Sequence, residues 1–178
     1  MRSKMLLATI AFMLGSTTAG LAQDFGFQVS NGLTLEQVVV TQESNTATPT
    51  SSGGTGSSAV ISQQGSDNSA VSSISSSPNA GTLVLQTGDD NTAVAVIQNS
   101  PGSAIAQAQL GTNNFSAAAI VGGSGNGIAT AQIGNSLSSS VALVNSVDTK
   151  VVYGQAGQGY SGGIVVRNAP RGTVVRLN

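Results

Sequence analysis

The sequence predicts an all-β fold, a β-solenoid in which strand–turn–strand rungs stack on one another. Two observations lead to this prediction: a repeat of 23 residues, and an alternation of inward and outward positions within each repeat. The repeat is marked by a glutamine at the same position of five consecutive copies: Gln63, Gln86, Gln109, Gln132 and Gln155. A fixed period of this length is typical of architectures in which each unit packs only on its neighbours.

Each glutamine is followed by the residues of a tight turn. A glycine comes two positions later in every copy: Gly65, Gly88, Gly111, Gly134 and Gly157. An asparagine comes five positions later in the first three copies (Asn68, Asn91 and Asn114), and Leu137 and Tyr160 replace it in the last two. Glycine reaches a positive φ at little steric cost. Proline cannot donate a ladder hydrogen bond, so Pro78, Pro101 and Pro170, each fifteen positions after a glutamine, predict the opposite corner of the rung.

The segments on both sides of the glycine turn alternate with period two. The inward positions before the glutamine are Ala59 and Ile61, Thr82 and Val84, Ile105 and Gln107, Ile128 and Thr130, and Val151 and Tyr153. After the turn, Asn91, Ala93, Ala95 and Ile97 share one face in the second copy. Side chains alternate between the faces of a strand, so these residues are expected to line a thin core between two sheets.

Stacking of such rungs has two consequences. Identical positions lie about 4.7–4.9 Å apart, so the glutamines and asparagines are expected to form ladders of side-chain amides. The end strands present unpaired N–H and C=O groups, and a second copy offers the next rung in register. The sequence therefore predicts head-to-tail self-association through a contact that does not close into a ring.

The first 22 residues have the pattern of a secretory signal peptide. Arg2 and Lys4 precede a short apolar run, and the small residues around Gly20 offer a cleavage site. This run is shorter than the about 20 residues that a transmembrane helix needs. The mature chain is therefore expected to be secreted, to begin at Gln23 and to have no transmembrane segment.

The rest of the chain divides by composition and register. It comprises a lead-in with a Gly/Ser linker (23–56), five repeats (57–166) and a basic C-terminal half-rung or tail (167–178). The register places Asn45 where Asn68 lies in the next copy, so residues 34–51 are expected to form one degenerate rung. The same register predicts that Arg176 faces inward, where a charge on an end strand discourages further pairing.

The composition excludes conventional site chemistry. The chain has no cysteine and no histidine, so the usual nucleophile–base pairs and the commonest metal ligands are missing. We expect no catalytic residue, no metal and no cofactor. Asp67, Asp89 and Asp90 fall at successive turns but lack the Gly-Gly-x-Gly-x-Asp pattern of calcium-binding β-rolls, so they are interpreted as solvated turn acids.

Charge is sparse and divided along the chain. All seven acidic residues lie between positions 23 and 149. The basic residues that follow the signal peptide are all close to the C-terminus: Lys150, Arg167, Arg171 and Arg176. This basic end predicts contact with an anionic surface such as the outer cell surface, and a solubilising end cap is the alternative. No nucleic-acid partner is expected.

The pattern Gln-x-Gly-x-x-Asn-x-Ala, preceded six residues earlier by Ser, resembles the curlin repeat of bacterial curli fibres. Ser57 to Ala70 fits it fully, Gln86 to Ala93 fits with Ala80 in place of the serine, and Ser103 to Ser116 fits except for the final alanine. The resemblance covers residues 57–166 and, more weakly, residues 34–51. The closing glutamine of the family is replaced here by aliphatic residues: Ile74, Ile97, Ile120, Leu143 and Val166.

The resemblance implies a structural subunit of an extracellular amyloid fibre. Such subunits leave the cell through a dedicated outer-membrane pore with accessory proteins, assemble with other curlin subunits on the cell surface, and support adhesion and biofilm formation. It also implies that the turn acids slow premature assembly. In such fibres, major subunits form most of the fibre, and minor, nucleating subunits have poorer and more basic last repeats. The basic C-terminal end of this chain favours the minor, nucleating role.

Two other classes of function remain open. A monomeric, secreted β-solenoid that serves as an adhesin or ligand-binding module would share the same repeat. Parallel β-helices also host carbohydrate-active enzymes, but the sequence offers no convergent pair of acids. The segment Gly122–Gly127 has the glycine content of a phosphate loop without its lysine or its spacing, and it is interpreted as a corner of the rung.

Overall fold

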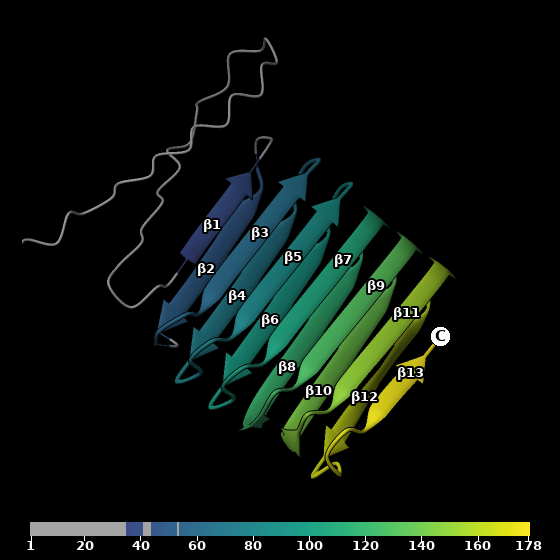
Figure 1. The fold of residues 1–178 in the computed structure, drawn as a ribbon. Helices are drawn as coiled ribbons and strands as arrows, with labels where there is room; N and C mark the ends of the chain where they lie inside the picture. The colour runs from purple at the N-terminus through teal and green to yellow at the C-terminus, as the bar shows by residue number, and fades with distance from the viewer. Residues whose placement is uncertain (1–34, 41–43, 53) are drawn as a thin grey trace, which may run out of the picture.

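The computed structural model describes residues 35–40, 44–52 and 54–178, and these form a β-solenoid (Figure 1). The predicted signal peptide, residues 23–34 and 41–43 of the lead-in, and Gly53 of the linker lie outside the described residues. Within the described ranges, no helix has the length and apolar character needed to cross a bilayer. The predicted all-β solenoid fold is confirmed.

The described strands follow one another with short turns. They are β1 (Leu35–Val40), β2 (Thr46–Ser52), β3 (Ser58–Gln64), β4 (Ser69–Ser75), β5 (Gly81–Thr87), β6 (Thr92–Gln98), β7 (Ala104–Thr112), β8 (Phe115–Ser124), β9 (Gly127–Asn135), β10 (Ser138–Val147), β11 (Lys150–Gln158), β12 (Ser161–Arg167) and β13 (Val174–Leu177). Odd-numbered strands form one parallel sheet in the order β1-β3-β5-β7-β9-β11-β13, and even-numbered strands form a second in the order β2-β4-β6-β8-β10-β12. Each rung therefore consists of an odd strand and the even strand that follows it.

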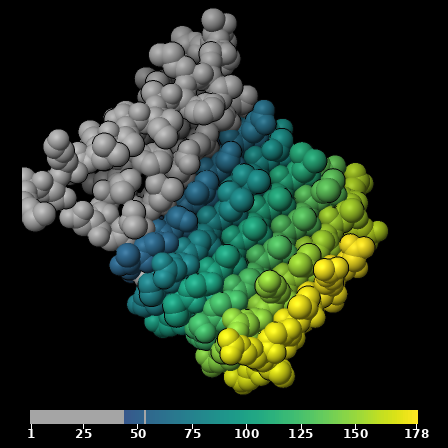
Figure 2. Space-filling view, in the orientation of Figure 1, coloured from purple at the N-terminus to yellow at the C-terminus, as the bar shows by residue number. Residues whose placement is uncertain are grey.

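The register of both sheets repeats the period of the sequence. Gln63 pairs with Gln86, Gln86 with Gln109, and Ala70 with Ala93, so equivalent residues of successive rungs lie side by side. The turns are joined in the same way, because the Asp90 N–H donates to the Ser66 carbonyl at 3.1 Å and the Asn113 N–H donates to the Asp89 carbonyl at 3.0 Å. The rungs thus stack as parallel rows across the molecule (Figure 2).

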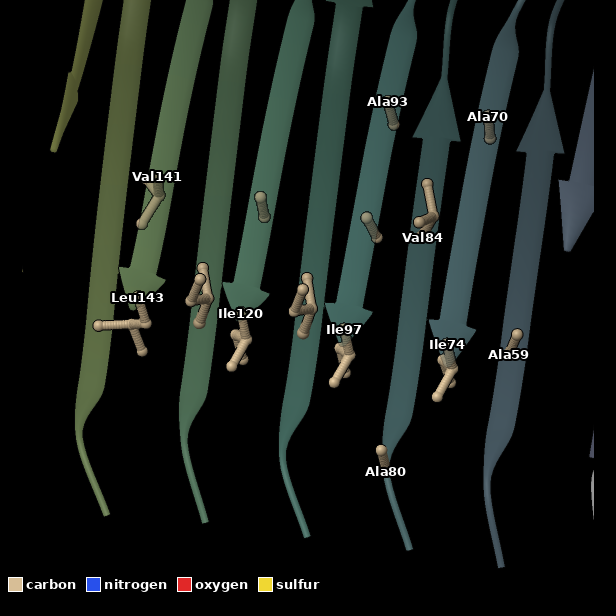
Figure 3. Close-up of a cluster of buried hydrophobic side chains, with 14 of the residues drawn as sticks. Ala59, Ala70, Ile74, Ala80, Val84, Ala93, Ile97, Ile120, Val141 and Leu143 are labelled. Atoms are coloured by element: carbon tan, nitrogen blue, oxygen red, sulfur yellow. The ribbon is translucent and has the colours of Figure 1, made fainter. Parts of the chain in front are cut away.

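The core is a thin apolar layer between the two sheets. One column of aliphatic side chains runs along the even strands, formed by Ile74, Ile97, Ile120 and Leu143, each with no exposed surface (Figure 3). Smaller residues fill the remaining space, such as Ala59 and Val84 on the odd strands and Ala70 further along β4. Since these residues occupy alternate positions, the period-two pattern decides which face of each strand is buried.

The first described rung continues the repeat but carries a proline. β2 pairs with β4 in the same 23-residue register, with Ala47 beside Ala70 and Pro49 beside Ser72. The Thr46 N–H donates to the Asn68 carbonyl of the neighbouring rung at 2.8 Å. Pro49 lies three residues after Thr46, so its nitrogen faces away from β4, toward the edge at which no other described strand pairs.

The last half-rung departs from the repeat by one residue. Arg167 pairs with Val144, an offset of 23, whereas Val174 pairs with Lys150, an offset of 24. The extra residue is accommodated in the turn at Gly172, which has a φ of 80°. A shift by one residue exchanges the two faces of a strand. The expectation that Arg176 faces inward is therefore wrong: it pairs with the outward residue Val152 and is exposed.

Candidate functional site

The five glutamines form one continuous ladder inside the solenoid. The side-chain amide of each glutamine donates to Oε1 of the next, from Gln63 to Gln86 (2.8 Å), Gln86 to Gln109 (2.8 Å), Gln109 to Gln132 (2.9 Å) and Gln132 to Gln155 (2.8 Å). Gln63, Gln86, Gln109 and Gln132 are almost fully buried. An uncharged amide can be buried at this depth because its neighbours above and below satisfy it.

The same amides also join the two sheets. The second N–H of each glutamine donates to a backbone carbonyl of the preceding even strand, for example from Gln86 to Ser69 at 3.1 Å and from Gln132 to Phe115 at 2.9 Å. Each of the first four glutamines, Gln63 to Gln132, therefore links three strands: its own, the next odd strand and the even strand across the core. A hydrophobic residue at this position would leave those carbonyl groups without these donors.

The asparagines form a second ladder at the glycine turn. Oδ1 of Asn68 accepts from both the backbone N–H (3.1 Å) and the side-chain amide (3.0 Å) of Asn91, and Asn91 accepts in the same way from Asn114. Asn45 extends the ladder toward the N-terminus, since its Oδ1 accepts from the Asn68 N–H at 2.8 Å. The ladder ends at Leu137, whose N–H donates to Asn114 at 3.0 Å.

The turn glycines complete this corner. The carbonyl groups of Gly88, Gly111 and Gly134 accept bonds of 2.7–2.8 Å from the asparagine of the preceding rung. All five turn glycines have positive φ, between 108° and 139°. In four of them, Gly65 to Gly134, a Cβ atom would also collide with the carbonyl of the next turn glycine. Glycine is thus required here both by the backbone conformation and by the close approach of the next rung.

A third polar network lies at the opposite corner, which sequence reasoning did not identify as a site. Asn126 is 2% exposed there, its amide donates to the Ser146 carbonyl at 2.7 Å, and its Oδ1 accepts from the Thr149 N–H at 3.1 Å. Ser77 accepts from the Ser100 N–H at 2.9 Å. The signal was present in the sequence: Ser77, Ser100 and Ser146 fall on one 23-residue register, which Gly123 completes.

The glutamine ladder stops at the last full rung. The Gln155 amide donates to the Ser138 carbonyl at 2.9 Å, and its other bond goes to the hydroxyl group of Tyr153 at 3.3 Å rather than to a further glutamine. Tyr153 occupies the inward position two residues before Gln155. The end of the ladder is therefore closed by a residue of the same strand.

The turn acids lie on the outside of the glycine corner. Oδ1 of Asp89 accepts from the hydroxyl group (2.7 Å) and the N–H (2.9 Å) of Ser66 in the preceding rung. The Ser66 hydroxyl and then the Ser66 N–H lower the pKa of Asp89 below its ordinary value of 3.8. Asp67 and Asp90 occupy left-handed turn positions, with φ of 53° and 57°. Among the described residues, no three acidic, histidine or cysteine side chains come together as a metal site.

The four C-terminal basic residues are all exposed. Lys150 begins β11, Arg167 ends β12, and Arg176 lies on the outer face of β13. Arg171 lies in the preceding turn and pairs with the Asp148 carboxylate; the Arg171 side chain is 80% exposed and that of Asp148 41%. The basic residues thus surround one end of the solenoid without being brought into a single pocket.

These observations define a class of protein: a parallel β-solenoid with internal amide ladders and 23-residue rungs, a geometry compatible with a curlin-like fold. Comparison of the chain with known protein families, with curated proteins and with solved structures gives no match.

Proposed function

We propose that the chain is a secreted structural subunit of an extracellular amyloid fibre of the curlin type, which supports cell adhesion and biofilm formation. One observation carries this proposal: equivalent amides of successive rungs bond to one another in register and parallel to the stacking axis. Like-on-like amide ladders between in-register parallel strands are the interactions that stabilise amyloid. The proposal places no catalytic residue and no cofactor in the chain.

The proposed mechanism is templated addition of strands at the ends. Among the described strands, β1 and β2 at one end and β12 and β13 at the other pair on one side only. An incoming chain would add its end strands to these edges, and main-chain bonds would give affinity. The inward and outward alternation of the end strands would select the register, because a slip by one residue would turn the inward face of the added strand outward.

The C-terminal end favours the minor, nucleating role over that of the major subunit. The last two repeats differ most from the others: Leu137 and Tyr160 replace the ladder asparagine, and the four basic residues lie in the last full rung and in the half-rung that follows it. In this proposal the partners are other curlin subunits, with export through the secretion pore and its accessory proteins. The basic end would contact the anionic outer surface of the cell.

The test is a time course of dye-detected aggregation of the purified chain, followed by fibre diffraction of the product. We expect a lag, then growth, and reflections near 4.7 and 10 Å. Replacing Gln63 and Asn68 by Ala should slow growth strongly. The matched control replaces Gln64 and Asn113, which are exposed, by Ala. Equal kinetics for both variants would exclude the amide ladders as the basis of assembly.

The second candidate is a monomeric, secreted β-solenoid that acts as an adhesin or ligand-binding module. Two features of the end rungs favour it, because both are of the kind by which edge strands avoid pairing with another chain. Pro49 lacks an N–H at the outer edge of β2, and β13 is short and one residue out of register. A purified chain that stays monomeric at high concentration and retains a folded β-sheet spectrum would support this candidate over the fibre subunit.

A further inference from the structure

A shallow trough lies on the outer face of the odd-strand sheet. It has a volume of about 490 Å³ and crosses β3, β5, β7, β9 and β11 near their first residues. Its floor is made of small residues: Gly81, Ala104, Ala106, Gly127 and Ala129. Larger side chains line it toward its two ends along the stacking axis: Val60 and Leu83 on one side, Val152 on the other. The trough exists because consecutive rungs carry glycine or alanine at the same outward positions.

A ridge lies on the same face at the other end of the same strands. Leu110 of β7 is 50% exposed and Ile133 of β9 is 57% exposed. Each lies six residues after a trough residue, Ala104 or Gly127, and an even separation keeps both on one face of the sheet. The middle strands β7 and β9 therefore carry small residues where they begin and large apolar residues where they end.

We propose that this face pairs with the same face of a second copy, so that two fibres associate side by side. A two-fold axis parallel to the stacking direction reverses the strands but keeps each rung at its own level. It places Leu110 opposite Ala104 of the second copy, and Ile133 opposite Gly127, so each ridge enters the facing trough. A two-fold axis along the strands would instead set ridge against ridge.

The charges of this face are compatible with the pairing. On strands β3 to β13, the outward residues of the odd-strand sheet include two charged side chains, Lys150 and Arg176, and no acid. Under the proposed symmetry Lys150 faces Ala156 of the second copy rather than its own equivalent. The pairing therefore buries no pair of like charges at the centre of the contact, where such a pair would oppose association.

The contact area of one subunit is too small for a stable pair, so side-by-side pairing requires a fibre. This inference therefore rests on the proposed function. Five strands of about seven residues present about 23 Å by 24 Å, or about 550 Å² on each copy. Specific protein pairs commonly bury about 800 Å² per partner. One subunit therefore offers too little surface for a stable pair, whereas a fibre multiplies the same contact with every subunit added. Pairing is expected in fibres and not between monomers.

The experiment uses the absence of natural cysteine from the chain. Chains with Ala104→Cys and chains with Leu110→Cys are mixed, assembled, and treated with a bis-maleimide that spans about 10 Å, the spacing of packed sheets. We expect cross-links between the two kinds of chain in fibres and none in monomers. Either variant assembled alone should give few cross-links. The control chain carries Ala117→Cys, which lies on the outer face of the even-strand sheet.

The other outcomes are distinct. Fibres that form without the mixed cross-link would overturn the pairing while leaving the fibre proposal intact, and this face would then be free for another partner. Cross-links within the Leu110→Cys fibres alone would indicate the wrong symmetry and also overturn it. Failure to form fibres would contradict the proposed function, on which the pairing rests.

A second measurement uses electron microscopy of two double variants. The variant with both Leu110→Ala and Ile133→Ala should form single fibres. The control variant with both Val94→Ala and Val96→Ala, on the outer face of the other sheet, should still form paired fibres.

Discussion

Tyr153 and Gly162 face each other across the core of the last full rung, and a Cβ atom on Gly162 would collide with the Tyr153 hydroxyl group. The equivalent positions of the third described rung hold Val84 and Ala93, both fully buried. The larger side chain on one sheet is thus accompanied by the loss of a methyl group on the other. This relationship also allows the Tyr153 hydroxyl to reach Gln155 and end the amide ladder.

The first prediction concerns this pair. Gly162→Ala should destabilise the chain by about 1 kcal/mol, the low end of the cost of overpacking, because the Tyr153 hydroxyl group must move away from the added methyl group at an exposed position. Adding Tyr153→Val should recover most of the loss, since the double variant recreates the Val84 and Ala93 arrangement. The measurement is the midpoint of urea unfolding for both single variants and the double variant. Additive losses would show that the two positions are independent.

A second prediction tests the glutamine ladder within one chain. Gln109→Ala removes the acceptor of Gln86 and the donors to Gln132 and to the Thr92 carbonyl. Each buried group left unsatisfied costs about 1–3 kcal/mol, so we expect a loss of at least about 2 kcal/mol by denaturant unfolding. Gln98→Ala, at an exposed position of β6, is the control and should change stability by less than about 0.5 kcal/mol. Similar losses for both variants would contradict a ladder role.

The third prediction separates two reasons for glycine at the turns. Gly111 has a φ of 126°, and a Cβ there would meet the Gly134 carbonyl. Gly102 has a φ of 65° but open space around it. Gly102→Ala should therefore cost only the about 1 kcal/mol of an unfavourable backbone conformation. Gly111→Ala should cost clearly more, because the next rung must also move. Equal thermal unfolding midpoints for the two variants would mean that rung spacing is not limited by glycine.

Much of the fold followed from the sequence because the period was visible in residues with strict geometric roles. The turn glycines require positive φ, and the buried glutamines require a partner at the same level of the next rung. The network around Asn126 escaped prediction for the opposite reason. One column of this network, which contains Ser77 and Ser100, is made mostly of serine. Serine is common throughout this chain, so the 23-residue spacing of these two residues did not stand out.

The orientation of Arg176 could not be predicted by counting from the repeat. The sequence contains no mark of the one extra residue in the final turn, and a single insertion exchanges the inward and outward faces of the strand. The contact of Tyr153 could not be predicted from the repeat either. Its inward direction follows from alternation, but its contact with Gly162 depends on the space left across the core, which only the packed structure defines.

The fourth prediction is a dependence on pH. The bonds from Ser66 lower the pKa of Asp89 in the folded chain. A lowered pKa means that Asp89 contributes stability above its ordinary value of 3.8, and that this contribution is lost as the pH falls through the folded value. Asp89→Asn should remove this part of the acid sensitivity while keeping the bond, because Asn135 accepts from the Thr112 N–H at the equivalent position. The measurement is urea unfolding at pH 7 and pH 3.

The fifth prediction concerns the basic end. Arg167, Arg171 and Arg176 are exposed at the C-terminal end of the solenoid, and Arg171 is paired with Asp148. Exposed pairs contribute little to stability, so replacing the three arginines by glutamine should leave the unfolding midpoint nearly unchanged. If this end attaches fibres to an anionic cell surface, the same variant should release fibre material into the medium. Salt should release the unmodified chain in the same way, because exposed charges are screened. Retention unchanged by both treatments would show that the basic end is a solubilising cap rather than an anchor.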